Sequence, residues 1–206
     1  MDNFTYEYGD RTDKLEKYEW DSTWIEQTDN TTAKRVYYIG DSISAGLRNH
    51  CTSAAGGEYV FDGCATSKAL DNSFYYDTIS LFGRQLPKTD VVLFNNGLHG
   101  WHLEDGTDYA AWYEKAVEFL LKEFDKSKLV LMLSTTLADR ERNERCKARN
   151  RAVSLIAEKY SLPVIDLYSE SVDRVSYQFD DGCHFRSEGC KLMAEFVVNE
   201  IRRIDG

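Results

Sequence analysis

The sequence predicts an α/β protein: a three-layer α/β/α sandwich built on a parallel sheet of about five strands. Short apolar runs typical of buried strands alternate along the chain with longer amphipathic runs typical of helices. Helical stretches of ten or more residues separate successive strands, and such crossovers join parallel strands. The chain has 206 residues, of which 42% are hydrophobic and 13% aromatic, enough for one buried core.

Each expected strand is a short run rich in apolar and β-branched residues. The strands are expected at residues 35–39, 58–61, 90–94, 128–133 and 163–167. Helices are expected after Ser44 and at residues 67–81, 109–124 and 142–160, with a last helix near the chain end. The pattern is clearest at 109–124, where apolar residues recur every three or four positions. Ser187 is expected to cap the last helix, with Glu188 in its first turn.

The first part of the chain differs from the rest because it has no clear periodicity. Residues 1–33 are polar, acidic and aromatic, and we expect them to form an N-terminal arm packed on a single domain spanning residues 34–206. Trp20 and Trp24 lie four residues apart, so they could share one face of a helical turn.

Composition excludes several classes of partner. The chain carries 25 basic and 35 acidic residues, a net charge of −10, which argues against binding to nucleic acid or anionic membranes. No segment approaches the roughly 18 consecutive apolar residues of a membrane span. Residues 1–34 lack the apolar core of a secretory signal. We therefore expect a cytoplasmic protein, although a leader removed from the mature chain would still allow secretion.

The five cysteines form no Cys-x-x-Cys pair. An odd number in a domain of this size fits reduced thiols better than a disulfide framework. Cys183, His184 and Cys190 lie close in sequence, but their spacing matches no common zinc pattern. We expect neither a metal nor another cofactor, and the sequence carries no prediction of oligomeric state.

The candidate functional residues lie just after the expected strands. The first strand runs directly into Gly40-Asp41-Ser42, and residues 95–99 and 135–140 follow later strands. The carboxyl ends of parallel strands meet at one edge, so these segments should share a rim. Ser42 could project from its strand-to-helix turn into a cleft, with backbone N–H groups nearby. The simpler alternative is that Asp41 or Ser42 only caps the following helix.

Near the other end of the chain, Asp181-Gly-Cys-His184 places a carboxylate three residues before an imidazole. A serine hydroxyl becomes a nucleophile only when a base takes its proton. His184 is the best base among four histidines, because Asp181 can reach back and fix its tautomer. Asp180 is the alternative partner.

These two fragments resemble the first and last sequence blocks of the SGNH hydrolase superfamily, which includes GDSL-type lipases, esterases and acetylhydrolases. The likeness extends over roughly residues 34–204, including the order of elements. It implies a flavodoxin-like hydrolase fold, with Ser42 as nucleophile, His184 as general base and Asp181 as orienting carboxylate. It also implies that the backbone N–H of Ser42 contributes to an oxyanion hole.

The middle blocks depart from the family pattern. Gly63 is the candidate for the oxyanion-hole glycine after the second strand, or else a glycine needed for loop geometry. The third block, Gly-x-Asn-Asp, is replaced by the stretch from Asn95 to Gly100. If Gly97 matches the glycine of that block, His99 stands in the asparagine position and could donate from its ring. Asn96 and Asn95 are the alternative donors. The sequence therefore suggests a divergent branch of the superfamily.

The expected substrate contacts are Trp101 and Asp41. An aromatic side chain beside a polar cleft can stack on a sugar, although Trp101 could equally anchor its loop. Arg140, Arg142 and Arg145 could meet an acidic substrate group, but a solvated helix start is the simpler interpretation. The sequence thus predicts a serine esterase that hydrolyses a small acyl ester, such as an acetyl group on a carbohydrate. The alternative is a catalytically impaired carbohydrate-binding module with the same fold.

Overall fold

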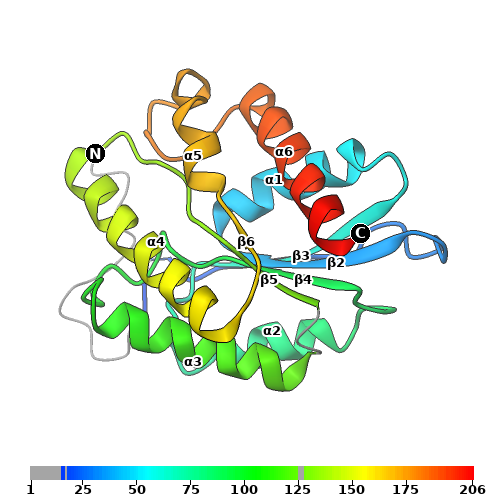
Figure 1. Cartoon of the computed structure of the whole chain (residues 1–206), viewed down its shortest axis with the longest axis horizontal. Helices are drawn as coiled ribbons and strands as arrows, with labels where there is room; N and C mark the ends of the chain where they lie inside the picture. Colours follow the sequence, from blue (N-terminus) through cyan, green and yellow to red (C-terminus); the bar gives the residue numbers. More distant parts are fainter. Residues whose placement is uncertain (1–14, 17, 125–127) are drawn as a thin grey trace.

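The computed structural model describes residues 15–16, 18–124 and 128–206. Within these residues the strands form one six-stranded sheet in the order β1-β3-β2-β4-β5-β6 (Figure 1). The strands are β1 (Asp21–Trp24), β2 (Lys34–Gly40), β3 (Tyr59–Thr66), β4 (Val91–Phe94), β5 (Leu129–Met132) and β6 (Val164–Ile165). Strands β2 to β6 pair in parallel, and β1 pairs antiparallel with β3.

Helices cover both faces of the sheet, which confirms the predicted three-layer sandwich (Figure 1). The helices are α1 (Ser42–Ala54), α2 (Tyr75–Gly83), α3 (Asp108–Glu123), α4 (Arg140–Tyr160), α5 (Leu167–Val172) and α6 (Ser187–Asp205). One buried cluster joins the sheet to α1, α5 and α6, and a second joins it to α2, α3 and α4. Among the described residues, no helix is long and apolar enough to cross a membrane.

The strand predictions hold for all five parallel strands, whereas the arm differs from expectation. Trp20 and Trp24 do not share a helical turn, because Asp21–Trp24 runs extended along β3. An edge strand presents unpaired backbone groups, and β1 satisfies those of β3 from Gly63 to Thr66.

Two helix predictions also need correction, and one short helix was not predicted. Residues 67–74 precede α2 as a loop, because the side chains of Thr66 and Asn72 accept hydrogen bonds from nearby backbone N–H groups. The short helix α5 was not predicted. Ser187 is the first residue of α6 rather than its cap, since Arg186 occupies the cap position without a side-chain cap bond.

A buried ion pair ties the arm to the sheet. The guanidinium of Arg35 on β2 forms two hydrogen bonds with the Asp62 carboxylate on β3, at 2.8 Å and 2.6 Å, and both side chains are buried. The same guanidinium donates to the carbonyls of Glu26 and Gln27. The Glu26 N–H in turn donates to Asp62. The loop after β1 is therefore fixed by charge-assisted bonds inside the molecule.

We expect Arg35→Met to lower the free energy of unfolding by about 3–5 kcal/mol, because it leaves the Asp62 carboxylate buried without its charged partner. Urea unfolding followed by tryptophan fluorescence measures this change. The double variant Arg35→Met/Asp62→Leu is the matched control and should recover most of the loss. A loss below about 1 kcal/mol in the single variant would contradict the assignment, because that is the range of an exposed pair.

Candidate active site

Ser42 lies at the turn from β2 into α1. The Asp41 carboxylate caps the helix by accepting a hydrogen bond from the Ile43 N–H at 2.9 Å. Gly40 makes this tight turn possible, because a Cβ there would lie 2.7 Å from both the Cβ and the Oγ of Ser44. The half-buried Ser42 is thereby presented at the carboxyl end of the sheet. Helix capping accounts for Asp41, and Ser42 is left for another role.

The structure brings Ser42, His184 and Asp181 together in one chain of hydrogen bonds. The Oγ of Ser42 lies 2.7 Å from Nε2 of His184, and Nδ1 of His184 lies 2.7 Å from Oδ2 of Asp181. The alternative partner, Asp180, is instead exposed and lies 3.8 Å from Arg186. The arrangement therefore has the geometry of a nucleophile, a base and an orienting acid.

The Asp181 carboxylate is held ionised by its surroundings. Partial burial acts to raise its pKa, but hydrogen bonds from the Cys183 N–H, the His184 ring and the His184 N–H outweigh it and lower the pKa overall. An ionised Asp181 accepts a hydrogen bond from the Nδ1–H of neutral His184, which leaves Nε2 as the acceptor for the Ser42 hydroxyl. Because the pKa of Asp181 is lower in the folded state, its ionised form adds to the free energy of unfolding above about pH 4. That contribution is lost as the pH falls through the folded-state pKa.

Gly182 shapes the loop between the acid and the base. Its φ is +65°, and a Cβ there would lie 2.6 Å from the Cβ of Ala138. Its carbonyl accepts from the Ala138 N–H at 2.8 Å, and its own N–H donates to the Phe179 carbonyl at 2.9 Å. The segment before α4 therefore packs against the loop that carries Asp181 and His184.

Gly63 does not lie where the sequence placed it. The strand expected at 58–61 continues to Thr66, so Gly63 stands inside β3 and pairs with Tyr38 on one side and Trp24 on the other. A Cβ at this position would lie 2.6 Å from the Arg48 side chain. Its role is close packing inside the sheet, and the expectation that it serves as an oxyanion-hole glycine at the rim is wrong.

The loop after β4 carries the three candidate side-chain donors. It starts beside Ser42's strand, where the Asn95 N–H donates to the Ile39 carbonyl at 3.0 Å. The Asn95 amide nitrogen donates to the Met132 carbonyl and to Ser134, toward β5. Both of its hydrogens are thereby used in holding the loop.

Asn96 and His99 differ from Asn95 in what they contact. The Asn96 amide nitrogen donates one hydrogen bond to the Lys68 carbonyl at 3.2 Å, which joins the loops after β3 and β4. His99 is 6% exposed, and its Nδ1 lies 2.8 Å from the Glu16 carboxylate. Asn96 and His99 therefore remain the two candidates for a side-chain donor.

Arg149 on α4 binds the backbone of the loop after β4, and the sequence analysis did not identify it. Its guanidinium is fully buried and donates to the carbonyls of His99 at 2.6 Å and Gly100 at 2.8 Å, and it also bonds the Asp105 carboxylate. Arg145, four residues earlier, pairs with the same carboxylate. No local pattern could have identified this contact, because Arg149 and His99 are 50 positions apart in the sequence. Only the one-turn spacing of the two arginines is visible in the sequence.

The two expected substrate contacts have structural roles here. Trp101 is half-buried, and the Arg149 guanidinium lies 4.3 Å from its ring centroid, so the ring anchors its loop. Asp41 is fully buried and caps α1, which makes its predicted contact with substrate wrong. Arg145 is likewise paired with Asp105 rather than left as a solvated helix start.

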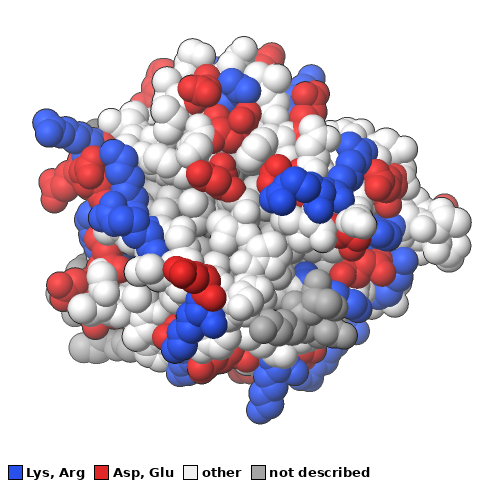
Figure 2. All heavy atoms as spheres, viewed as in Figure 1, with Lys and Arg blue, Asp and Glu red and all other residues white. Residues whose placement is uncertain are grey.

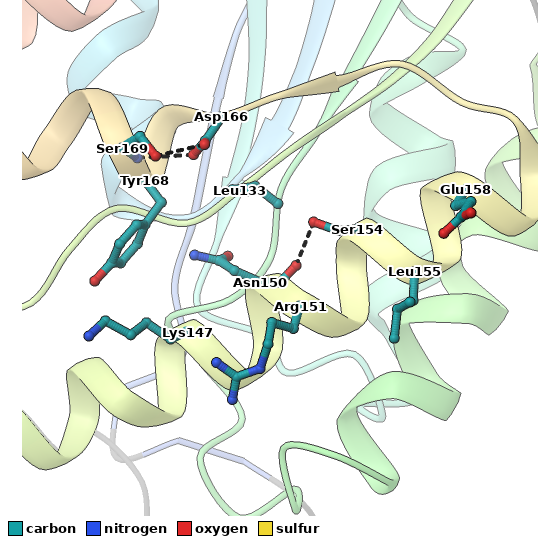
Figure 3. Close-up of a pocket in the computed structure, with 10 residues that line it drawn as sticks. All are labelled: Leu133, Lys147, Asn150, Arg151, Ser154, Leu155, Glu158, Asp166, Tyr168 and Ser169. Atoms are coloured by element: carbon teal, nitrogen blue, oxygen red, sulfur yellow. Dashed lines mark hydrogen bonds between the residues drawn. The ribbon is translucent and has the colours of Figure 1, made fainter.

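The structure also shows a pocket that does not include the three aligned residues. It has a volume of about 470 Å³ and lies between α4 and the β6–α5 junction (Figure 3). It is lined by Leu133, Lys147, Asn150, Arg151, Ser154, Leu155, Glu158, Asp166, Tyr168 and Ser169. Asp166 is engaged in capping α5 through Ser169, and Ser154 donates to the Asn150 carbonyl. Ser154, Asp166 and Ser169 are thus each engaged within their own helix or its cap.

No group of three His, Cys, Asp or Glu side chains within the described ranges is arranged to hold a metal ion. Burial raises the pKa of the Cys183 thiol to about 12, so this cysteine is protonated at neutral pH. A protonated thiol is a poor metal ligand and a poor nucleophile. Cys183 therefore acts as a spacer between Asp181 and His184.

The sequence matches no family model and no curated protein. Solved structures, by contrast, match closely in shape. A member of the lipolytic G-D-S-L family from Veillonella parvula aligns with a TM-score of 0.67 at 18% identity, covering 83% of this chain and all of the other. A lipase/acylhydrolase from Enterococcus faecalis aligns with a TM-score of 0.62 at 20% identity, covering 82% and 96% of the two chains.

A third similar structure is Axe2, an acetylxylan esterase from Geobacillus stearothermophilus. It aligns with a TM-score of 0.63 at 13% identity and covers 82% of this chain and 94% of the other. At these identities the likeness establishes the fold. The chain therefore has the SGNH/GDSL hydrolase fold, as its first and last motifs predicted.

We expect Gly182→Ala to be more destabilising than Gly56→Ala by about 1–3 kcal/mol, because only the former adds an overlap inside packed structure. Gly56 is a matched control, since its φ of +59° is similar but nothing lies within 4 Å of its Cβ position. Chemical denaturation of the two variants measures the difference. Equal losses in the two variants would show that the Ala138 contact does not constrain the loop.

Proposed function

We propose that this protein is a serine esterase that acts by acyl transfer through Ser42. One observation carries the proposal: a continuous hydrogen-bonded path from Ser42 through His184 to Asp181. It lies at the carboxyl ends of parallel strands, where α/β proteins place their active sites. The shared fold with lipases and esterases supports the same reaction class.

The reaction follows from the atoms of this path. His184 Nε2 removes the proton of Ser42 as Oγ attacks the ester carbonyl, and a tetrahedral oxyanion forms. The imidazolium of His184, stabilised by Asp181, then protonates the leaving alcohol and the carbon–oxygen bond breaks. Water attacks the acyl-enzyme with the same base, which releases the acid and restores Ser42.

The oxyanion needs hydrogen-bond donors that are in place before the reaction. The backbone N–H of Ser42 is one proposed donor, because it belongs to the first turn of α1, where N–H groups have no partner inside the helix. The second donor comes from the β4–α3 loop. We assign it to His99, with Asn96 as the alternative, because the loop runs from beside β2 and Asn95 is fully engaged elsewhere.

We propose a small acyl group, such as acetyl, on a carbohydrate alcohol as the substrate. One structural neighbour is an acetylxylan esterase, which supports this substrate class. Sugar binding without any turnover or serine labelling would instead favour a carbohydrate-binding module.

We expect Ser42→Ala to reduce kcat for p-nitrophenyl acetate by at least about 10³-fold, because the acyl acceptor is gone. A serine-directed fluorophosphonate should label the wild-type protein and fail to label this variant. Ser53→Ala, an exposed serine of the same helix, is the control and should behave as wild type. Retained turnover in a folded Ser42→Ala protein would refute the proposal.

We expect His99→Ala to lower kcat by about 10²–10³-fold, the usual cost of losing one oxyanion donor. His102→Ala is the matched control, because His102 lies in the same loop but its ring pairs with Asp71. Steady-state kinetics with p-nitrophenyl acetate measures both variants. If His99→Ala stays within about threefold of wild type while Asn96→Ala shows the loss, the donor is Asn96 instead.

A further inference from the structure

The segment before β1 runs across the carboxyl end of the sheet. Asp21 pairs with Thr66, the last residue of β3, so the chain before Asp21 continues past the end of that strand. Trp20 is held there by Ser67, whose Oγ accepts from the Trp20 N–H at 2.9 Å and whose N–H donates to the Trp20 carbonyl at 3.1 Å. This end of the segment is therefore fixed to the loop after β3.

The other end of the segment is fixed to the loop after β4. Glu16 is 4% exposed, and its Oε1 lies 2.8 Å from Nδ1 of His99 and 3.3 Å from the Gly100 N–H. The Trp20 ring meets the His99 ring edge-on at 6.1 Å. Strand β2 lies between β3 and β4, so Glu16 and Trp20 contact the two loops that flank Ser42.

We propose that Glu16 is a positioning residue of the active site, which fixes the His99–Gly100 part of the β4–α3 loop for oxyanion binding. This inference rests on the proposed esterase function and on His99 as its side-chain donor. Glu16, Glu19 and Trp20 then form part of one wall of the site, and hydrolysis at full rate requires Glu16 in place.

Arg149 and Glu16 both contact His99 and Gly100, through different groups of these two residues. Arg149 donates hydrogen bonds to the carbonyls of His99 and Gly100. Glu16 is hydrogen-bonded to the His99 ring and accepts from the Gly100 N–H. With both contacts present, the ring is held by Glu16 and the adjoining backbone by Arg149. Without Glu16, the ring loses its hydrogen bond at Nδ1, although Arg149 still holds the backbone.

The protons of the pair explain why a carboxyl group suits this position. For His99 to donate from Nε2 while Nδ1 is hydrogen-bonded to Glu16, the pair must hold two protons between them. They are shared either as imidazolium and carboxylate or as neutral imidazole and carboxylic acid. Both forms leave a hydrogen on Nε2, which lies on the side of the ring away from Glu16.

Glu16 itself is held before any substrate arrives. Its N–H donates to Oε1 of Glu19 at 2.9 Å, and Oε2 of Glu19 accepts from the Ser67 hydroxyl at 3.2 Å. Lys68, the next residue of the same loop, pairs with Asp21 at 2.7 Å. The wall is thus attached at several points, as a preorganised site requires.

The test compares Glu16→Ala, Glu16→Gln and a control, Asp29→Asn, which removes an exposed carboxylate from the same N-terminal part of the chain. We expect Glu16→Ala to lower kcat for p-nitrophenyl acetate at least about tenfold with KM changed less than about threefold, because only the charge developing in the transition state is affected. Glu16→Gln keeps the hydrogen on Nε2 of neutral His99 only if its amide nitrogen, rather than its oxygen, bonds Nδ1, and it should show an intermediate loss. Asp29→Asn should match wild type.

A double-mutant cycle separates positioning from general damage. In a His99→Ala background, Glu16→Ala should cost no more than about twofold further, because the group through which it acts is already gone. The rate of fluorophosphonate labelling of Ser42 should fall in parallel with kcat. Thermal unfolding of each variant identifies the folded proteins, and Glu16→Gln carries the test if Glu16→Ala does not fold.

The inference is overturned if folded Glu16→Ala or Glu16→Gln keeps kcat within about twofold of wild type, or if the loss is the same in the His99→Ala background. If either result is found while wild type is active and Ser42→Ala is inactive, only the role of Glu16 is overturned. The esterase proposal then stands. A wild-type protein that shows neither turnover nor labelling overturns the esterase proposal as well.

Discussion

The hydrogen bond between Ser42 and His184 joins residues 142 positions apart, and it depends on how two helices pack. Helices α1 and α6 lie on the same face of the sheet and share one buried cluster (Figure 1). Each begins at the same rim, so the turn before α1 and the loop before α6 meet there. The two helices are in van der Waals contact, since a Cβ built at Gly46 of α1 would lie 3.8 Å from Sγ of Cys190 on α6. The candidate site is therefore a consequence of core packing.

The sequence predicted the parts of the site that are encoded locally. A strand ending in Gly40-Asp41-Ser42 and a tight Asp-Gly-Cys-His loop each define their own geometry, so Ser42, Asp181 and His184 could be named in advance. Gly63 was misplaced because the end of β3 could not be located from residue pattern alone. Glu16 and Arg149 could not be found, because each acts through contacts with the distant loop after β4.

Charge is used differently inside this protein and on its surface. On the face shown in Figure 2, acidic and basic side chains are interspersed around an uncharged centre. Inside, Arg35 and Arg149 are each fully buried and are surrounded by carbonyls and a carboxylate. One arginine fixes the arm and the other fixes the loop after β4. Each arginine joins a regular element, β2 or α4, to a segment without regular structure, where hydrophobic packing alone specifies conformation poorly.

Strand β1 also bears on how the protein behaves at high concentration. The opposite edge of the sheet ends in β6, which is only two residues long and offers little template for another chain. The longer strand β3 would be the open edge if β1 were missing, because β1 pairs with its last four residues. A chain trimmed to begin at residue 34 would present those backbone groups to other copies, and strand-to-strand association would then compete with solubility.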